Sequence, residues 1–215
     1  LGGFYLAVIP LYPWYLPAWE VLALIALAFA AEDAARGLAR LKLARGLSAL
    51  RISIVVLIAL SLGVLAGSAR EFRVSEALIE RQGREQIGLW LRAYASPGDT
   101  VFLEPLGYIG YYSNLKTYDY PGLSSPEVVA ARKAGAVSWS QLIHALHPTW
   151  LVLRPFEAVG IDHSSHSAEL LHRDYAAVKG FTCYDQIRSR PFLPGRYWLL
   201  VDSQFIIYHR RKSSG

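Results

Sequence analysis

The residues of this chain whose types and spacing point most clearly to chemistry surround Asp119. This aspartate lies between two tyrosines and directly before a Pro-Gly turn, and Tyr108, Tyr111 and Tyr112 come shortly before it. Its carboxylate either hydrogen-bonds a bound substrate or accepts hydrogen bonds from the following loop. The tyrosines either form one wall of a binding site or pack between a helix and a sheet. Tyr111 and Asp119 are therefore candidate binding residues, with both alternatives open.

Histidine and cysteine offer a second kind of chemistry. His163 and His166 share a polar, Ser-rich segment with Asp162, and His172 follows. Zinc sites need a third protein ligand and supporting hydrogen bonds, and this segment is typical of a solvated loop, so we predict no metal site. Cys183 is the single cysteine, which excludes an intrachain disulfide. We expect it to be a half-buried side chain rather than a nucleophile.

Several classes of site are excluded by missing motifs. Neither a G-x-S-x-G nucleophile elbow nor a G-x-x-x-x-G-K-[ST] phosphate loop occurs. The pair Gly107-x-x-Gly110 is too short a pattern to indicate a nucleotide site. The formal net charge of +5 is dispersed and forms no basic run interleaved with aromatics, so nucleic acid is not expected as a partner.

The elements that must position these residues begin with two apolar stretches. Residues 52–69 contain no charge, and a helix of that length, at about 1.5 Å per residue, crosses most of a bilayer core of roughly 30 Å. An earlier span is expected from about Pro13 or Trp14 to Ala31. Charged residues make up 18 % of the chain and hydrophobic residues 53 %, whereas about 25 % of the residues in soluble domains are charged.

Aromatic residues cluster at the start of the first expected span. Tyr12, Trp14 and Tyr15 lie among prolines, as in the aromatic belt at the headgroup level of a membrane. They either anchor the helix or line a groove for a substrate, so they are also candidate binding residues. Glu20 follows them and is expected to face other helices rather than lipid.

A basic loop of about residues 32–51 joins the two spans. It contains Arg36, Arg40, Lys42, Arg45 and Arg51, and short basic loops stay on the cytoplasmic side. We therefore predict two domains. Residues 1–69 form two transmembrane helices joined by a cytoplasmic loop, and residues 70–215 form an extracytoplasmic domain.

The pattern of residues 70–215 predicts a small soluble α/β domain with a mixed sheet. One long helix is expected from Glu71 to Tyr94, before the stop signal Ser-Pro-Gly-Asp at 96–99. Short apolar runs alternating with helices predict four to six strands, parallel at first and with an antiparallel edge. The expected strands are 100–104, 116–120, 149–153, 175–182, 197–201 and 204–209, and the expected helices after the first are 125–134, 139–146 and 165–172.

Two segments carry a resemblance to a known family. The run PLYPWYLPA, followed by a basic loop, a further span and an outside α/β domain, resembles the C-terminal end of GT-C superfamily membrane glycosyltransferases. The segment Gly107–Val128 (GYIGYYSNLKTYDYPGLSSPEV) is similar to a "G-Y-Y … D-x-x-G-L-x-x-P" run after the last helix of bacterial members. The relatives are the ArnT-like, protein-mannosyltransferase-like and arabinofuranosyltransferase-like enzymes.

The resemblance implies an enzyme of the bacterial plasma (inner) membrane that moves a sugar from a polyprenyl-phosphate donor to an acceptor at the outer face. Its catalytic acidic residue lies in the first outside loop. No residue here matches that position, so this chain is expected to be inactive alone and to act with upstream transmembrane helices. No cofactor is implied for this chain, while a divalent metal ion in the full-length enzyme would bind carboxylates upstream.

A different class of protein fits the same pattern. The chain begins at Leu1 and contains no Met, from which we expect a piece of a longer protein. The alternative is a non-catalytic, membrane-anchored α/β module that binds a partner protein or a cell-wall glycan. The sequence leaves both functions open, together with the identities of the sugar and the acceptor.

Overall fold

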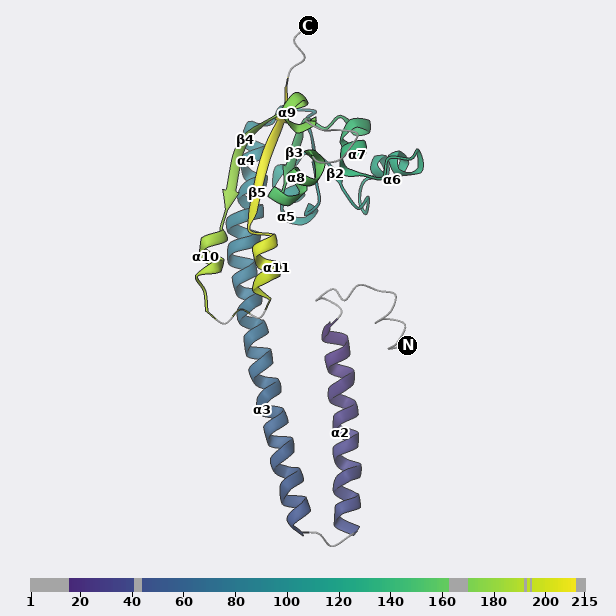
Figure 1. Cartoon of the computed structure of the whole chain (residues 1–215), viewed down its shortest axis with the longest axis vertical. Coiled ribbons are helices and arrows are strands. Elements are labelled where there is room, and N and C mark those ends of the chain that lie inside the picture. Colours follow the sequence, from purple (N-terminus) through teal and green to yellow (C-terminus); the bar gives the residue numbers. More distant parts are fainter. Residues whose placement is uncertain (1–15, 41–43, 163–169, 192, 194, 212–215) are drawn as a thin grey trace. The chain divides into compact units, whose positions relative to one another are not determined.

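The computed structural model describes residues 16–40, 44–162, 170–191, 193 and 195–211 (Figure 1). The chain divides into two compact units, Leu1–Ala66 and Gly67–Gly215. The first unit contains helix α2 (Leu16–Arg40) and most of helix α3 (Ala44–Val74). The second is an α/β domain built on a five-stranded mixed sheet, which confirms the predicted class of the domain.

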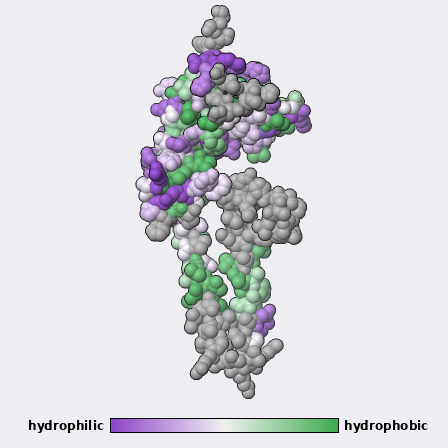
Figure 2. All heavy atoms as spheres, in the orientation of Figure 1, coloured by the Kyte–Doolittle hydropathy of each residue, from purple (hydrophilic) through white to green (hydrophobic). Residues whose placement is uncertain are grey.

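Large apolar side chains of α2 and of α3 up to Leu65 are exposed, and Figure 2 shows hydrophobic surface on both helices. In α3 the exposed large apolar side chains are Val55, Val56, Leu57, Ile58, Leu60, Leu62, Leu65 and Phe72. Among the described residues, one helical run, Ile54–Tyr94, is long and apolar enough to cross a membrane by length and composition alone.

The second apolar stretch and the helix expected from Glu71 to Tyr94 belong to one continuous helical run. Helix α3 continues directly into a π-helical segment, η2 (Ser75–Glu85), and then into α4 (Gln86–Tyr94). Leu78 and Ile87 are both buried, although they lie nine residues apart, which is two and a half turns of an α-helix and would place them on opposite sides of it. The wider π turn keeps these side chains on the face toward the domain.

The sheet has the order β2-β1-β3-β5-β4. Strands β1 (Thr100–Leu103), β2 (Lys116–Asp119) and β3 (Trp150–Leu153) run parallel, while β5 (Gln204–Arg210) pairs antiparallel with both β3 and β4 (Tyr175–Thr182). The helices around the sheet are α5 (Leu106–Ser113), α6 (Pro126–Lys133), α7 (Trp139–Leu146), α8 (Pro155–Asp162), α9 (Leu170–Asp174), α10 (Tyr184–Arg188) and α11 (Arg196–Val201).

Both faces of the central strands are buried, which explains why these strands are apolar without alternation. Val101 and Val152 pack with Ile87 of α4 on one face, while Phe102 and Leu151 pack on the other against α6 to α9. Successive side chains of a strand point to opposite faces. The two clusters therefore make a helix–sheet–helix sandwich.

The expected strand 197–201 is wrong, because these residues form the helix α11. A short apolar run does not distinguish a strand from a helix by periodicity alone. Strand pairing explains why residues 197–201 are not a strand, because β5 already pairs with β3 on one edge and with β4 on the other. No edge of β5 is left for residues 197–201, and they close over the helical run instead.

Candidate functional site

The three parallel strands place two charged residues side by side at their carboxyl ends. Glu104 follows β1 and Arg154 follows β3. The connection after β1 leads to β2 on one side, while the chain after β3 leads to the strands on the other side. Ligands of open α/β sheets bind in the crevice outside the carboxyl ends of strands where such connections diverge. The topology therefore predicts a binding site at the carboxyl ends of β1 and β3.

Arg154 is the centre of a charged network at this position. Its side chain is buried, with 7 % of the residue surface exposed. The guanidinium donates to Glu104 Oε2 over 2.7 Å, to Asp202 Oδ1 over 2.6 Å and to Glu157 Oε1. The Arg154 backbone N–H also donates to Glu157 Oε2 over 2.7 Å. Charge-assisted bonds of this kind fix geometry strongly.

A second arginine extends the network to the π-helix. Arg84 of η2 donates to Asp202 Oδ2 over 2.8 Å and to Glu80 Oε1. Asp202 therefore bridges Arg84 and Arg154 with its two oxygens. Two guanidiniums face four carboxylates in this set, so the network carries an excess of negative charge when all its members are ionised.

The pKa shifts follow from burial and from these pairings. Burial raises the pKa of Glu157 more than the attraction of Arg154 lowers it, and burial likewise raises the pKa of Glu80 despite Arg84. Burial alone would lower the pKa of Arg154. The nearby carboxylates of Glu157, Asp202 and Glu104 outweigh that effect and raise it. Arg154 is therefore a permanent cation that the surrounding carboxylates must neutralise.

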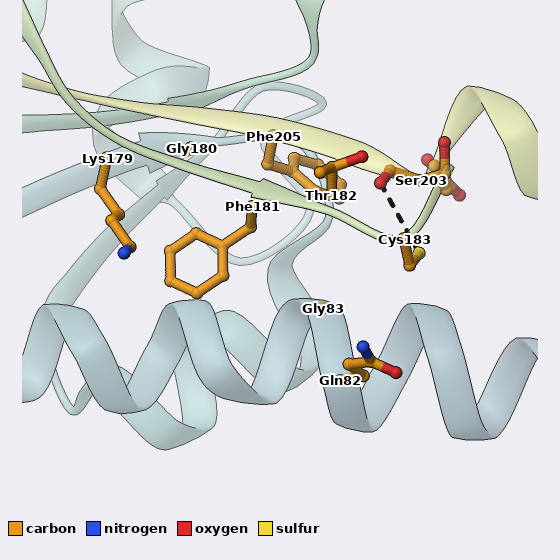
Figure 3. A pocket seen from close by; sticks show the side chains of 10 residues that line it. Gln82, Gly83, Lys179, Gly180, Phe181, Thr182, Cys183, Ser203 and Phe205 are labelled. Carbon is orange, nitrogen blue, oxygen red and sulfur yellow. Dashed lines mark hydrogen bonds between the residues drawn. The ribbon is translucent and has the colours of Figure 1, made fainter. Parts of the chain in front are cut away.

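A pocket of about 330 Å³ opens beside this network, between η2 and the paired strands β4 and β5 (Figure 3). In Figure 3 the side chains of Lys179 and Phe181 extend from β4 toward the helix that carries Gln82 and Gly83. The pocket combines aromatic, hydroxyl, amide and charged groups. The lining residues are Gln82, Gly83, Lys179, Gly180, Phe181, Thr182, Cys183, Asp202, Ser203 and Phe205.

Asp202 belongs both to the pocket and to the charged network. It lines the pocket and bridges Arg84 and Arg154. When its carboxylates are ionised, the network places an excess of negative charge behind the pocket, which disfavours a phosphate, while Lys179 places one positive charge in the lining. Aromatic faces with a few polar groups suit a ligand that is partly apolar and partly hydroxylated. The pocket therefore combines an apolar surface with polar groups that suit hydroxyls or a cationic group.

The structure gives Asp119 a set of local partners. Its carboxylate accepts hydrogen bonds from Leu123 N over 2.6 Å, Ser124 N over 3.1 Å, Ser124 Oγ over 2.9 Å and Ser125 Oγ. Burial alone would raise the pKa of Asp119, but the hydrogen bonds from Ser125, Ser124 and Leu123 outweigh it and lower the pKa. The carboxylate thus fixes the loop between β2 and α6.

The tyrosines of α5 lie in two environments. Tyr111 is 80 % exposed, and its ring contacts that of Tyr112 at a centroid distance of 5.1 Å. Tyr108 donates a hydrogen bond to Glu76 Oε1 over 3.1 Å, which raises the pKa of the Tyr108 hydroxyl. The described contacts of Tyr111 are thus within α5, while those of Asp119 are within its own loop.

Tyr12, Trp14 and Tyr15 lie outside the described residues, as do His163 and His166. Across the ranges that the structure describes, no group of three or more His, Cys, Asp or Glu side chains is arranged to hold a metal ion.

Cys183 is buried, and its thiol donates to Ser203 O over 3.6 Å. Burial raises the pKa of this thiol, which disfavours the reactive thiolate at neutral pH.

The sequence prediction missed Arg154, Asp202 and the pocket. A signal was available for the first of these, since the pattern of three apolar residues, one charged residue and a proline occurs twice, as VFLEP and LVLRP. Adjacent parallel strands with these ends bring opposite charges together. Asp202 carried no such signal, because it was expected to lie in the short turn between two strands, 197–201 and 204–209.

Comparison with known proteins gives one match. The model of the family described as Domain of unknown function (DUF8728) matches residues 73–203. No curated protein and no solved structure matches the chain. The matched range contains every member of the charged network and the strands β1 to β4. Because it covers more than half of the chain, the chain belongs to the family Domain of unknown function (DUF8728).

Proposed function

We propose that this chain is the C-terminal part of an integral-membrane glycosyltransferase of the GT-C type, with α2 and the apolar part of α3 as membrane spans. In this proposal the α/β domain lies outside the plasma membrane of a bacterium and seats the acceptor. Upstream transmembrane helices supply the catalytic acidic residue and hold the polyprenyl-phosphate donor.

The observation that carries the proposal is the exposed apolar surface of α3. Seven large apolar side chains between Val55 and Leu65 face outward. Removing each from water stabilises a protein by roughly 1.5–3 kcal/mol, so leaving all of them in water costs about 10 kcal/mol or more. That amount equals the whole stability of an ordinary domain. Hydrocarbon or further apolar helices are the surroundings that remove this cost.

The pocket supports the assignment of the acceptor rather than the donor to this domain. Its volume of about 330 Å³ lies at the lower end of the range of ligand pockets, about 300–1,000 Å³. The excess of carboxylates behind it repels the phosphate of a lipid-linked donor. The ammonium of Lys179 and the ring of Phe181, which extend toward η2 in Figure 3, offer contacts for a sugar.

The test is sugar transfer by membranes that contain the full-length protein, with labelled polyprenyl-phosphate sugars as donors. Replacing Lys179 by Ala removes one charged hydrogen-bonding group from the pocket. A bond of that kind stabilises by about 1.5–3 kcal/mol, so the KM for the acceptor should rise about tenfold or more while the KM for the donor stays constant. Lys133→Ala, on the exposed surface of α6, is the matched control.

Two results would contradict the proposal. The first is the absence of transfer from every polyprenyl-phosphate sugar by membranes in which the protein is folded. If such membranes still bound a cell-wall glycan, the non-catalytic module would be the better description. The second is an equal effect of Lys179→Ala and Lys133→Ala on the acceptor KM, which would remove the pocket from the acceptor site.

A further inference from the structure

Three exposed aromatic side chains lie close in sequence to the contact between α3 and the residues that begin α11. Phe72 of α3 and Tyr197 and Trp198 of α11 are 74 %, 70 % and 61 % exposed. All three lie within a few residues of one hydrogen bond, in which Gly195 N donates to Glu71 Oε2 over 2.7 Å. We call these three residues the aromatic collar.

The collar stands on a rigid base. Figure 1 shows α10 and α11 beside the helical run, and buried apolar side chains fill the contact. Gly195 lies so close to α3 that an added Cβ would meet Glu71 Oε1 at 1.9 Å, so a larger residue there would displace the Glu71 side chain and its hydrogen bond. The buried residues of the contact are Val74, Leu78, Ile79, Cys183, Ile187, Leu193 and Leu199.

Arginines surround the collar. Arg70 and Arg73 lie close to Phe72 on α3, Arg188 ends α10 and Arg190 follows it, and all four are exposed. Three carboxylates lie near these arginines. The carboxylate of Glu71 accepts a hydrogen bond from Gly195, and the carboxylate of Asp202 pairs with two arginines. The carboxylate of Asp185 is exposed at the start of α10. Positive charge therefore predominates around the three aromatic rings.

We propose that the aromatic collar docks into the headgroup region of a bilayer that contains anionic phospholipid. Phe72 lies only about 4.5 Å along the helix axis beyond Ala69, where the charge-free stretch ends. Tryptophan and tyrosine have an apolar ring with a polar end and prefer this depth of a membrane. Arginines beside them are attracted to anionic headgroups. The inference rests on the proposed membrane placement of α3 and extends it to the domain.

Docking of the collar would hold the pocket close to the membrane surface. Cys183 belongs both to the buried base of the collar and to the lining of the pocket. The collar and the pocket therefore share one rigid piece of structure. An acceptor that is itself attached to the membrane would reach the pocket without leaving the lipid surface.

The experiment places a fluorophore at single positions of the full chain in a Cys183→Ala background. The labelled positions are Phe72→Cys, Trp198→Cys, a control within the apolar stretch (Leu60→Cys) and an exposed control far from α10 and α11 in sequence (Val137→Cys). The protein is reconstituted into phosphatidylcholine vesicles with or without phosphatidylglycerol. Brominated lipids and aqueous iodide then quench each fluorophore in turn.

We expect brominated lipid to quench the labels at 72 and 198 at least twofold more than the label at 137, with iodide showing the reverse order. Phosphatidylglycerol should increase the lipid quenching at 198, and the double variant Arg188→Gln/Arg190→Gln should lose that increase. Lipid quenching at 60 reports the placement of α3 separately.

Two results would overturn the docking of the collar while leaving the span intact, provided that the label at 60 is quenched by lipid. In the first, iodide reaches the label at 198 as readily as the label at 137. In the second, neither quencher reaches 198, which would mean that protein covers the collar. If lipid fails to quench even the label at 60, the proposed membrane placement itself is wrong.

Discussion

Removing the guanidinium of Arg154 should destabilise the α/β domain more than removing any exposed charge. Arg154→Met keeps most of the side-chain volume but leaves the buried carboxylate of Glu157 without its cation. Breaking a buried ion pair in this way costs about 3–5 kcal/mol. For a chain of this size, about 2–4 °C of melting temperature corresponds to each kcal/mol. The melting temperature should therefore fall by about 6–20 °C.

The assay is thermal unfolding of the purified protein in detergent, followed by circular dichroism. Arg81→Met is the matched control, because Arg81 is exposed and pairs with Glu76 over 3.0 Å, and such pairs contribute about 0–1 kcal/mol. The double variant Arg154→Met/Glu157→Gln removes the unpaired charge as well. It should recover a large part of the lost stability, because a neutral amide is less costly to bury than a carboxylate.

The pH dependence has a definite sign. Burial raises the pKa of Glu157 in the folded protein, and Arg154 opposes that rise. Without Arg154 the folded-state pKa rises further, so the variant loses stability as the pH increases through that value and regains it when Glu157 is protonated. The deficit of Arg154→Met should thus narrow as the pH falls from 7 toward 5. Two results would refute this reasoning. In the first, Arg154→Met loses no more stability than Arg81→Met. In the second, the double variant Arg154→Met/Glu157→Gln is as unstable as Arg154→Met.

Three further predictions concern single positions. Asp119→Asn should lower the free energy of unfolding by about 1.5–3 kcal/mol. The folded-state pKa of Asp119 is lowered, so the parent protein should lose this contribution as the pH falls below about 4. Equal loss of stability in acid by the parent and the variant would contradict this prediction. Gly88→Ala should destabilise the protein by about 1–3 kcal/mol, because the added Cβ would meet Tyr112 Cβ at 2.7 Å. The control is Gly160→Ala, whose Cβ meets nothing within 4 Å. It should leave the melting temperature unchanged or raise it. Iodoacetamide should label Cys183 slowly at pH 7.5 and rapidly in denaturant, because the thiol is buried with a raised pKa, and rapid native labelling would count against that burial.

Much of the α/β domain was predictable because its strands are buried on both faces. The apolar runs that contain β1 and β3 lie between turns, and such runs identify buried strands without any knowledge of their partners. The expected parallel start and antiparallel edge agree with the observed sheet. Local sequence also carries the helix α7, whose Ser138 and Gln141 form a capping box.

The features that sequence did not reveal depend on tertiary pairing. The run that became α11 has the composition of a strand, and only the occupied edges of β5 exclude it from the sheet. Asp202 became a bridge between Arg84 and Arg154 through contacts that are distant along the chain. The π-helix likewise depends on packing, because its wide turns keep Leu78 and Ile87 on one face.

The most direct measurement of the central claim is the behaviour of the chain in isolated membranes. Cells that produce the full chain are broken, and the membranes are washed with alkaline carbonate, which removes peripheral proteins but leaves integral ones. We expect the chain to remain in the pellet and to enter solution only with detergent, because the exposed apolar side chains of α2 and α3 require hydrocarbon around them. Release by carbonate into a monodisperse, detergent-free solution would contradict the membrane placement, and the proposed glycosyltransferase function would fall with it.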